Sequence, residues 1–275
     1  MTSLRALVRS NDSLYNIAKI GRDISLFPAG WPLKLPRMAM ISKIYSRTML
    51  NPTRLFNICD AVEQARDRGI AGDLVECGVW SGGSLALMAL WDLRQGGNRN
   101  YHAFDSFEGL PPPTEEDNEV YARFLANRGK AGAAVAGQLV ATGVCKGDGA
   151  DTVRQFFDRV GIPRDRSVFH VGWFQDTVPL AAKDIGTIAI LRIDGDWYNS
   201  TKVCLEHLYD LVSPGGLVIV DDYGAFSGCR KAVDEFRMER DIGSPIVPID
   251  DECIMFEKPQ SPAPIEVQQV FRQSA

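Results

Sequence analysis

The sequence has no excess of basic residues, because its 275 residues include 30 Lys and Arg against 35 Asp and Glu, a formal net charge of −5. Nucleic-acid-binding domains normally carry a basic excess, so we expect no nucleic-acid partner. The sequence also lacks a run of about 20 apolar residues, which a membrane-spanning helix needs. It has no apolar leader that ends in a small-residue cleavage site. We therefore expect a cytoplasmic protein with no membrane partner.

Closely spaced cysteine pairs are absent as well. The six cysteines are scattered and form no Cys-x-x-Cys motif. Without an export signal, reduced and mostly buried thiols are expected rather than disulfides. What the sequence does contain is 45% hydrophobic and 24% charged residues, the composition of an ordinary globular protein. This composition excludes a disordered, collagen-like or coiled-coil chain.

Four segments are expected along the chain. Residues 1–50 have weak periodicity broken by prolines, which predicts an arm with short helices that serves as a lid or as the contact of a homo-oligomer. Residues 51–260 form the main domain, and within it residues 107–149 are too long for an ordinary connection and predict a mobile lid insertion. Residues 261–275 form a C-terminal tail.

The main domain alternates between short apolar segments and segments with helical spacing. The predicted strands cover residues 73–79, 101–105, 167–171, 188–193 and 217–220, with one or two edge strands within 245–258. Helical spacing follows most of these strands. This order predicts an α/β fold, a doubly wound and mostly parallel sheet covered by helices on both faces.

In such a sheet ligands bind beyond the carboxyl ends of the strands. The first strand ends in Glu76-Cys-Gly78, and glycines continue up to Ser84, where a buried helix begins. Glycine allows a ligand to approach the backbone, and a helix N-terminus offers free N–H groups. Asp105, at the end of the second strand, can accept the hydroxyl protons of an adenosine ribose. Tight strand-to-helix turns need glycine anyway, so these features alone fit either a dinucleotide or S-adenosylmethionine.

Glu76 favours S-adenosylmethionine. A carboxylate at this strand tip would repel a pyrophosphate and suits the ammonium group of an amino acid. The glycine spacing also departs from the G-x-G-x-x-G fingerprint of dinucleotide-binding folds. Trp173, just beyond the third strand, either flanks an adenine ring or fills the core.

Four carboxylates follow the fourth and fifth strands. Asp194 and Asp196 end the fourth strand, and Asp221 and Asp222 end the fifth. Clustered carboxylates repel one another unless they are protonated or bridged by a cation. Ligands that are all oxygen favour a hard ion such as Mg²⁺, Mn²⁺ or Ca²⁺. The competing interpretation is that some of these acids cap the following helices, as Asp196 could do for the helix near Ser200.

Together these motifs resemble the macrocin O-methyltransferase family, over about residues 45 to 240 and in the same order. The matching segments are residues 73–84, 104–111, 172–179, 194–201, 214–223 and 228–236. The resemblance implies the Rossmann-like fold of class I S-adenosylmethionine-dependent methyltransferases. It also implies methylation of a sugar hydroxyl on a natural product such as a macrolide or an aminocoumarin.

The same resemblance assigns roles to individual residues. It implies that Asp194, Asp221 and Asp222 hold Mg²⁺. It also implies that Asp196 is the general base and that Asp194 is the second catalytic residue. It also implies a set of residues that line the pocket of the methyl donor, namely Met49, Glu76, Gly78, Ser84, Asp105, Ser106 and Trp173. The acceptor would be a small molecule.

Two other functions remain open from the sequence. A metal-dependent methyltransferase acting on a catechol or another phenol could use the same acids, because neighbouring phenol oxygens also chelate a cation. A non-catalytic module that binds an adenosine ligand is the alternative of another class. Binding the donor alone does not require four carboxylates at two strand tips.

Overall fold

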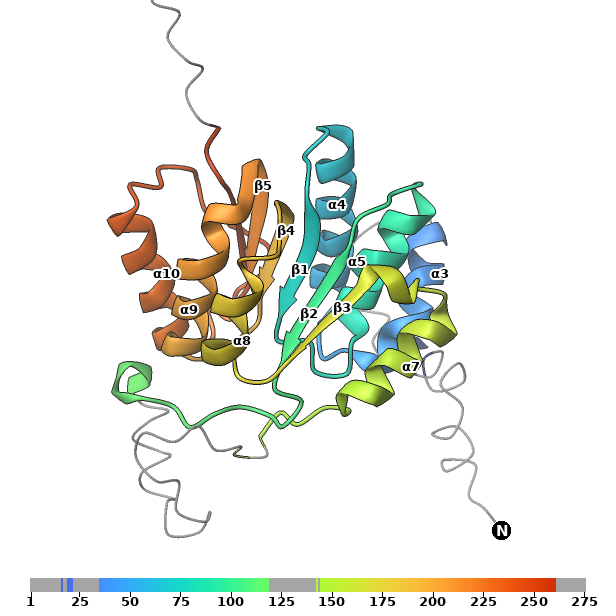
Figure 1. Ribbon diagram of the computed structural model, residues 1–275, viewed down its shortest axis with the longest axis horizontal. Helices are drawn as coiled ribbons and strands as arrows, with labels where there is room; N and C mark the ends of the chain where they lie inside the picture. Colours follow the sequence, from blue (N-terminus) through green and yellow to red (C-terminus); the bar gives the residue numbers. More distant parts are fainter. Residues whose placement is uncertain (1–15, 17–18, 22–34, 119–141, 143, 261–275) are drawn as a thin grey trace, which may run out of the picture.

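The computed structural model describes residues 16, 19–21, 35–118, 142 and 144–260, and Figure 1 shows its ribbon. The predicted C-terminal tail, most of the arm before Leu35 and the middle of the predicted lid lie outside the described residues. The division into arm, main domain, lid and tail therefore stays a prediction.

One seven-stranded sheet organises the described chain. Its strands are β1 (Asp73–Cys77), β2 (Tyr101–Asp105), β3 (Ser167–Val171), β4 (Ile188–Ile193), β5 (Val212–Val220), β6 (Val247–Pro248) and β7 (Ile254–Glu257). They lie in the order β3-β2-β1-β4-β5-β7-β6. The first five strands are parallel to their neighbours, and β7 pairs antiparallel with β5 and β6. The edge strands expected within residues 245–258 are thus present as two short strands.

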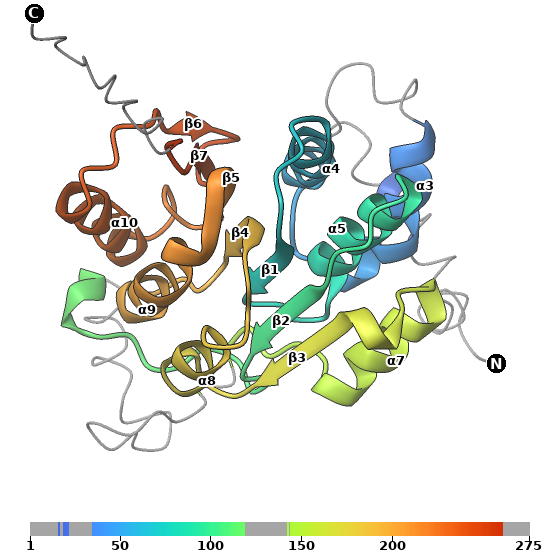
Figure 2. The ribbon, with the colours of Figure 1, turned by 45° about the horizontal axis from the view of Figure 1, so that its top comes forward.

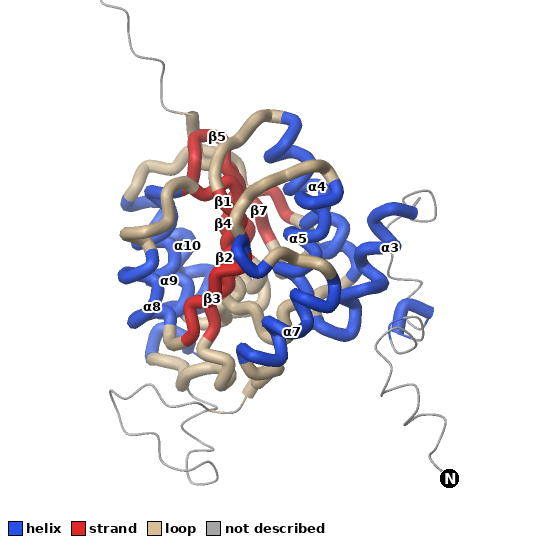
Figure 3. The backbone as a smooth tube through the Cα atoms, turned by 45° about the vertical axis from the view of Figure 1, so that its right-hand side comes forward, coloured by secondary structure: helices blue, strands red, loops and turns tan. Residues whose placement is uncertain are grey.

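Helices cover both faces of the sheet. They are α3 (Leu35–Ile44), α4 (Pro52–Asp67), α5 (Gly83–Arg94), α7 (Ala150–Val160), α8 (Phe174–Ala181), α9 (Tyr198–Leu208) and α10 (Ser227–Glu239). Figure 3 shows α3, α4, α5 and α7 on one side of the strands and α8, α9 and α10 on the other. Each layer packs its own hydrophobic cluster against the sheet. The predicted doubly wound α/β fold is confirmed.

Local sequence explains where the main elements begin. Asn51 accepts a 3.0 Å hydrogen bond from the backbone N–H of Arg54, and Pro52 occupies the first position of α4, a favourable helix start. The first ten residues of α5, Gly83 to Asp92, are all buried, as the sequence indicated. All six residues of β4 are buried between the two helical layers.

Two elements differ from the prediction. Strand β5 begins at Val212 instead of Leu217, because Val212 pairs with Ile188 although Pro214 and two glycines follow it. Helix α8 was not predicted, since it has only eight residues and contains Pro179.

The six cysteines are free, and only Cys145 is exposed. None of the helices in the described part of the chain has the length and apolar character needed to cross a membrane.

The described part of the arm packs on the main domain. Ile41 and Ile44 of α3 are wholly buried in the hydrophobic cluster that α4 and α5 share. The beginning of the predicted lid is also docked, because the segment from Phe107 to Asn118 runs past the carboxyl ends of the strands toward α9 and α10 (Figures 1 and 2). Residues 47–50, which follow α3, and residues 109–111 of the lid segment line the edge of the sheet where a ligand is expected.

Candidate active site

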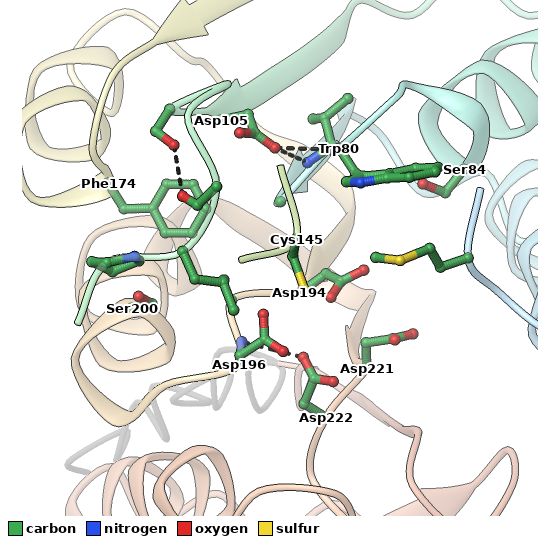
Figure 4. A pocket seen from close by; sticks show the side chains of 18 of the residues that line it. Trp80, Ser84, Asp105, Cys145, Phe174, Asp194, Asp196, Ser200, Asp221 and Asp222 are labelled. Carbon is green, nitrogen blue, oxygen red and sulfur yellow. Dashed lines mark hydrogen bonds between the residues drawn. The ribbon is translucent and has the colours of Figure 1, made fainter. Parts of the chain in front are cut away.

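A pocket lies beyond the carboxyl ends of β1, β2, β4 and β5. Its wall includes ten of the eleven residues proposed from the sequence, which are Met49, Gly78, Ser84, Asp105, Ser106, Trp173, Asp194, Asp196, Asp221 and Asp222. Glu76 does not line it. Figure 4 shows Trp80, Ser84 and Asp105 toward one end of the pocket and the four aspartates at the other.

The end of β1 passes very close to the end of β4. Gly78 has a φ of +94°, and a Cβ built on it would lie 1.8 Å from the carbonyl oxygen of Asp194. Only glycine can occupy this position without moving one of the two strand ends. Trp80 follows with a φ of +51°, so the turn from β1 into α5 is held in an uncommon conformation beside the pocket.

Asp105 holds that turn in place. One of its carboxylate oxygens accepts the backbone N–H groups of Val79 and Trp80, at 2.7 and 2.8 Å, and the other accepts that of Phe107 at 2.6 Å. Burial raises the pKa of Asp105, against the lowering effect of these hydrogen bonds. A carboxylate offers about four acceptor positions, so about one is left for a ribose hydroxyl. The proposed ribose contact stays a prediction.

Glu76 lies beneath the pocket, within the sheet. Its side chain is fully buried, and Oε1 accepts a 2.6 Å hydrogen bond from Arg192 of β4. No described residue donates a well-formed hydrogen bond to Oε2, although the nearby Ser84 hydroxyl lowers the pKa of Glu76 slightly. Burial outweighs these partners and raises that pKa to about 7. A contact between Glu76 and an ammonium group of the donor stays a prediction.

Two arginines that the sequence analysis did not identify balance part of the acidic charge. Arg192 also binds Asp194 at 2.9 Å and Asp221 at 2.5 Å. Arg54 of α4 binds the second oxygen of Asp221 at 2.7 Å. Arg192 was detectable as the one charged residue in an apolar strand, whereas Arg54 approaches Asp221 only through the tertiary fold.

Neither arginine forms a hydrogen bond or an ion pair with Asp196 or Asp222. Asp196 has a φ of +56°, and its backbone N–H donates to Asp222 at 3.2 Å. Its carboxylate points into the pocket and has no hydrogen-bond partner within the described part of the chain (Figure 4). Burial, followed by the charges of Asp194 and Asp221, raises the pKa of Asp196. Burial and the neighbouring aspartates likewise raise the pKa of Asp222.

The donor set fits a divalent cation. Ligand oxygens of Asp194, Asp221 and Asp222 lie within 4.8 Å of one another. Arg192 and Arg54 pair with Asp194 and Asp221, whereas Asp196 and Asp222 have no cationic partner among the described residues, so the cluster keeps an excess of carboxylates. Carboxylates without sulfur or imidazole ligands suit Mg²⁺, Mn²⁺ or Ca²⁺. Asp221, whose oxygens are each bonded to an arginine, still has lone pairs available.

The docked lid segment closes the side of the pocket near α9. The indole N–H of Trp197 donates to the carbonyl oxygen of Pro111 at 2.9 Å. Asp117, which is buried, accepts the backbone N–H of Tyr198 at 2.8 Å. Asp117 therefore accepts the first N–H of α9, whereas the Asp196 side chain does not cap this helix and lies in the pocket.

Comparisons with known proteins identify the family. The model of a family described as Macrocin-O-methyltransferase (TylF) matches residues 42–258 of the chain. The chain belongs to the macrocin O-methyltransferase family. It is accordingly an S-adenosylmethionine-dependent O-methyltransferase, as the sequence resemblance implied.

Individual methyltransferases are also similar to this chain. Mycinamicin III 3''-O-methyltransferase of Micromonospora griseorubida is 34% identical over 217 residues, which cover 78% of this chain and 79% of that protein. The 8-demethyl-8-(2,3-dimethoxy-alpha-L-rhamnosyl)-tetracenomycin-C 4'-O-methyltransferase of Streptomyces olivaceus is 38% identical over 207 residues, which cover 74% of this chain and 73% of that protein. The solved O-methyltransferase NovP superposes with a TM-score of 0.66 at 34% identity, over 78% of this chain and 83% of that one.

Proposed function

We propose that this O-methyltransferase transfers the methyl group of S-adenosylmethionine to a sugar hydroxyl of a glycosylated natural product, with Mg²⁺ bound at the aspartate cluster. The observation that carries the proposal is the pocket itself, which joins the glycine turn and Asp105 at one end to four aspartates at the other. The acceptor class is suggested by the names of the relatives, which include a mycinamicin and a rhamnosylated tetracenomycin methyltransferase.

The donor end of the pocket is formed by the turn from β1 into α5. Gly78 keeps the backbone free of side-chain bulk, and the start of α5 at Gly83 presents N–H groups that favour a carboxylate. Asp105 fixes the turn and retains room for a hydroxyl donor. The donor supplies a methyl group on a positively charged sulfur, and these residues orient that group toward the aspartates.

At the other end the aspartates bind the acceptor and remove its proton. Asp194, Asp221 and Asp222 would hold Mg²⁺, whose Lewis acidity favours loss of a hydroxyl proton from an alcohol. Asp196 projects into the pocket, and its carboxylate accepts no hydrogen bond from the described residues, so it is available to accept that proton. The pocket walls hold acceptor and donor in contact, which converts a bimolecular reaction into one within a complex.

The acceptor class is tested by measuring methyl transfer to a panel of compounds. The panel contains a glycosylated macrolide, a rhamnosylated aromatic polyketide, an aminocoumarin glycoside and a simple catechol. We expect turnover with at least one glycoside and a far lower rate with catechol. Transfer to catechol alone would favour the phenol methyltransferase instead, and no transfer to any acceptor despite donor binding would favour the non-catalytic module.

Asp196 is tested separately by the variant Asp196→Asn. Loss of general-base catalysis is expected to lower kcat by roughly 10²- to 10⁴-fold, while the affinity for S-adenosylhomocysteine in a calorimetric titration stays unchanged. Turnover at the wild-type rate would show that another group takes the proton.

A further inference from the structure

Arg54 joins three parts of the chain that are far apart in sequence. It lies in the first turn of α4, directly after the Met49 segment of the pocket wall. Its guanidinium donates to Asp221 after β5 at 2.7 Å and, on the β6–β7 turn, to Asp250 at 2.7 Å and Glu252 at 2.5 Å. Arg54 is only 8% exposed, so its bond to the buried Asp221 is shielded from water, whereas Glu252 lies at the surface.

The β6–β7 turn is itself rigidly held. The Asp250 carboxylate also accepts the side-chain N–H of Asn51 at 2.8 Å and the backbone N–H groups of Glu252 and Cys253 at 3.0 and 2.8 Å. Asn51 in turn caps the helix that carries Arg54. The guanidinium is therefore fixed both by its helix and by the carboxylate beside it.

The same turn supports the loop that follows the aspartates. The backbone N–H of Gly224 donates to the carbonyl oxygen of Glu252 at 2.7 Å, and a Cβ on Gly224 would lie 2.1 Å from the carbonyl oxygen of Asp251. Asp221 and Asp222 thus leave β5 into a loop that lies directly on the β6–β7 turn. Movement of that turn would displace both carboxylates.

Asp221 is consequently held from both sides. Arg192 occupies one of its oxygens and Arg54 the other, so the plane of the carboxylate is fixed before any cation arrives. Ligand carboxylates in metal sites are oriented by such outer hydrogen bonds, and removing one typically lowers metal affinity or activity 10- to 100-fold.

We infer that Arg54 is a positioning residue of the aspartate site, which together with Asp250 holds the Asp221 carboxylate in the orientation that binds the divalent cation. The inference rests on the metal dependence proposed above. It runs against the simplest electrostatic expectation, in which a guanidinium beside the site repels a cation and its removal tightens binding. The two effects predict opposite changes in affinity.

The test is a titration of Mn²⁺ into metal-stripped enzyme, followed by calorimetry and by the electron paramagnetic resonance signal of free Mn²⁺. The variants are Arg54→Gln and Arg54→Lys. Matched controls are Arg37→Gln and Arg37→Lys, because Arg37 is also 8% exposed and binds two carboxylates, Asp60 and Glu63 of α4, outside the pocket. Binding of S-adenosylhomocysteine without metal reports whether the pocket is intact.

We expect Arg54→Gln to weaken Mn²⁺ binding by roughly 10- to 100-fold. Arg54→Lys should weaken it less, because lysine keeps the charge but can bridge fewer oxygens. The Arg37 variants should bind Mn²⁺ with the affinity of the wild type. All the variants should bind S-adenosylhomocysteine with the affinity of the wild type. If Arg54→Gln does not fold, Arg54→Lys decides, and wild-type affinity in that variant overturns the inference.

Other outcomes overturn the inference in distinguishable ways. Unchanged or tighter Mn²⁺ binding by folded Arg54→Gln would show that Arg54 does not position the site. Equal weakening in the Arg37 variants would show a general loss of structure. If wild-type enzyme itself bound no Mn²⁺, the proposed metal dependence would fail, and this inference with it.

Discussion

Replacing Arg192 by glutamine tests the balance of buried charge beneath the site. Arg192 is 1% exposed and bonds to Glu76, Asp194 and Asp221. In the variant Asp221 keeps Arg54, whereas Asp194 and Glu76 both lose their cation, and of these two Glu76 is the fully buried one. Breaking a buried ion pair from one side costs about 3–5 kcal/mol, which for a domain of this size lowers the melting temperature by roughly 6–20 °C.

The loss should depend on pH in a defined way. Burial already raises the pKa of Glu76 to about 7 with Arg192 present, above its value of about 4.3 in an unfolded chain. The stability of the wild type therefore falls as the pH rises from about 4.3 to about 7, where Glu76 is ionised in the unfolded chain but not yet in the folded one, and levels off above about 7. Without Arg192 the pKa rises further, so above pH 7 the variant loses about 1.4 kcal/mol more per pH unit than wild type.

The assay is urea unfolding at pH 6, 7 and 8 for wild type, Arg192→Gln and the double variant Arg192→Gln/Glu76→Gln. Removing the stranded carboxylate should restore part of the stability at pH 8 and flatten the pH dependence. A loss below about 1 kcal/mol at pH 8 would refute the reasoning, since it falls short of any buried ion pair of this kind. So would a double variant no more stable than Arg192→Gln.

Two further substitutions test the geometry of the pocket walls. Gly78→Ala should lower soluble yield and donor affinity sharply, because its Cβ meets the Asp194 carbonyl. Gly161→Ala is the control, since Gly161 has a similar φ of +92° with open space around it, and this variant should cost only the backbone strain. Equal losses of melting temperature in the two variants would contradict the close approach at Gly78. Asp117→Ala removes the acceptor for the Tyr198 N–H. It should lower the free energy of unfolding by about 1 kcal/mol and should also lower kcat. An unchanged kcat would show that the docked lid segment does not shape the pocket.

Most of the fold could be predicted from hydrophobic periodicity. The strands β1 to β4 are apolar runs of five or six residues followed by helical spacing, and their predicted positions agree with the structure to within two residues. Helix α8 was missed because eight residues with an internal proline give a weak periodic signal. The start of β5 was missed because Pro214, Gly215 and Gly216 are typical of a turn, and only pairing with β4 makes Val212 a strand residue.

The site residues that lie at strand ends could be predicted from the sequence. Acids and glycines at the carboxyl ends of parallel strands must meet at one edge of the sheet, and the pocket gathers all the proposed site residues except Glu76. Glu76 instead lies within β1, where it is the register partner of Arg192 of β4 and bonds to its guanidinium. Arg54 could not be found in this way, because its contact with Asp221 spans 167 residues and depends on how α4 packs.

The central claim is that the aspartate cluster binds a divalent cation needed for methyl transfer. The most direct measurement is the rate of transfer to the best glycoside acceptor by enzyme stripped with EDTA, before and after Mg²⁺ is returned. The account predicts that stripping abolishes transfer and that Mg²⁺ restores it, while the affinity for S-adenosylhomocysteine is the same in both states. Full activity in the stripped enzyme would contradict it.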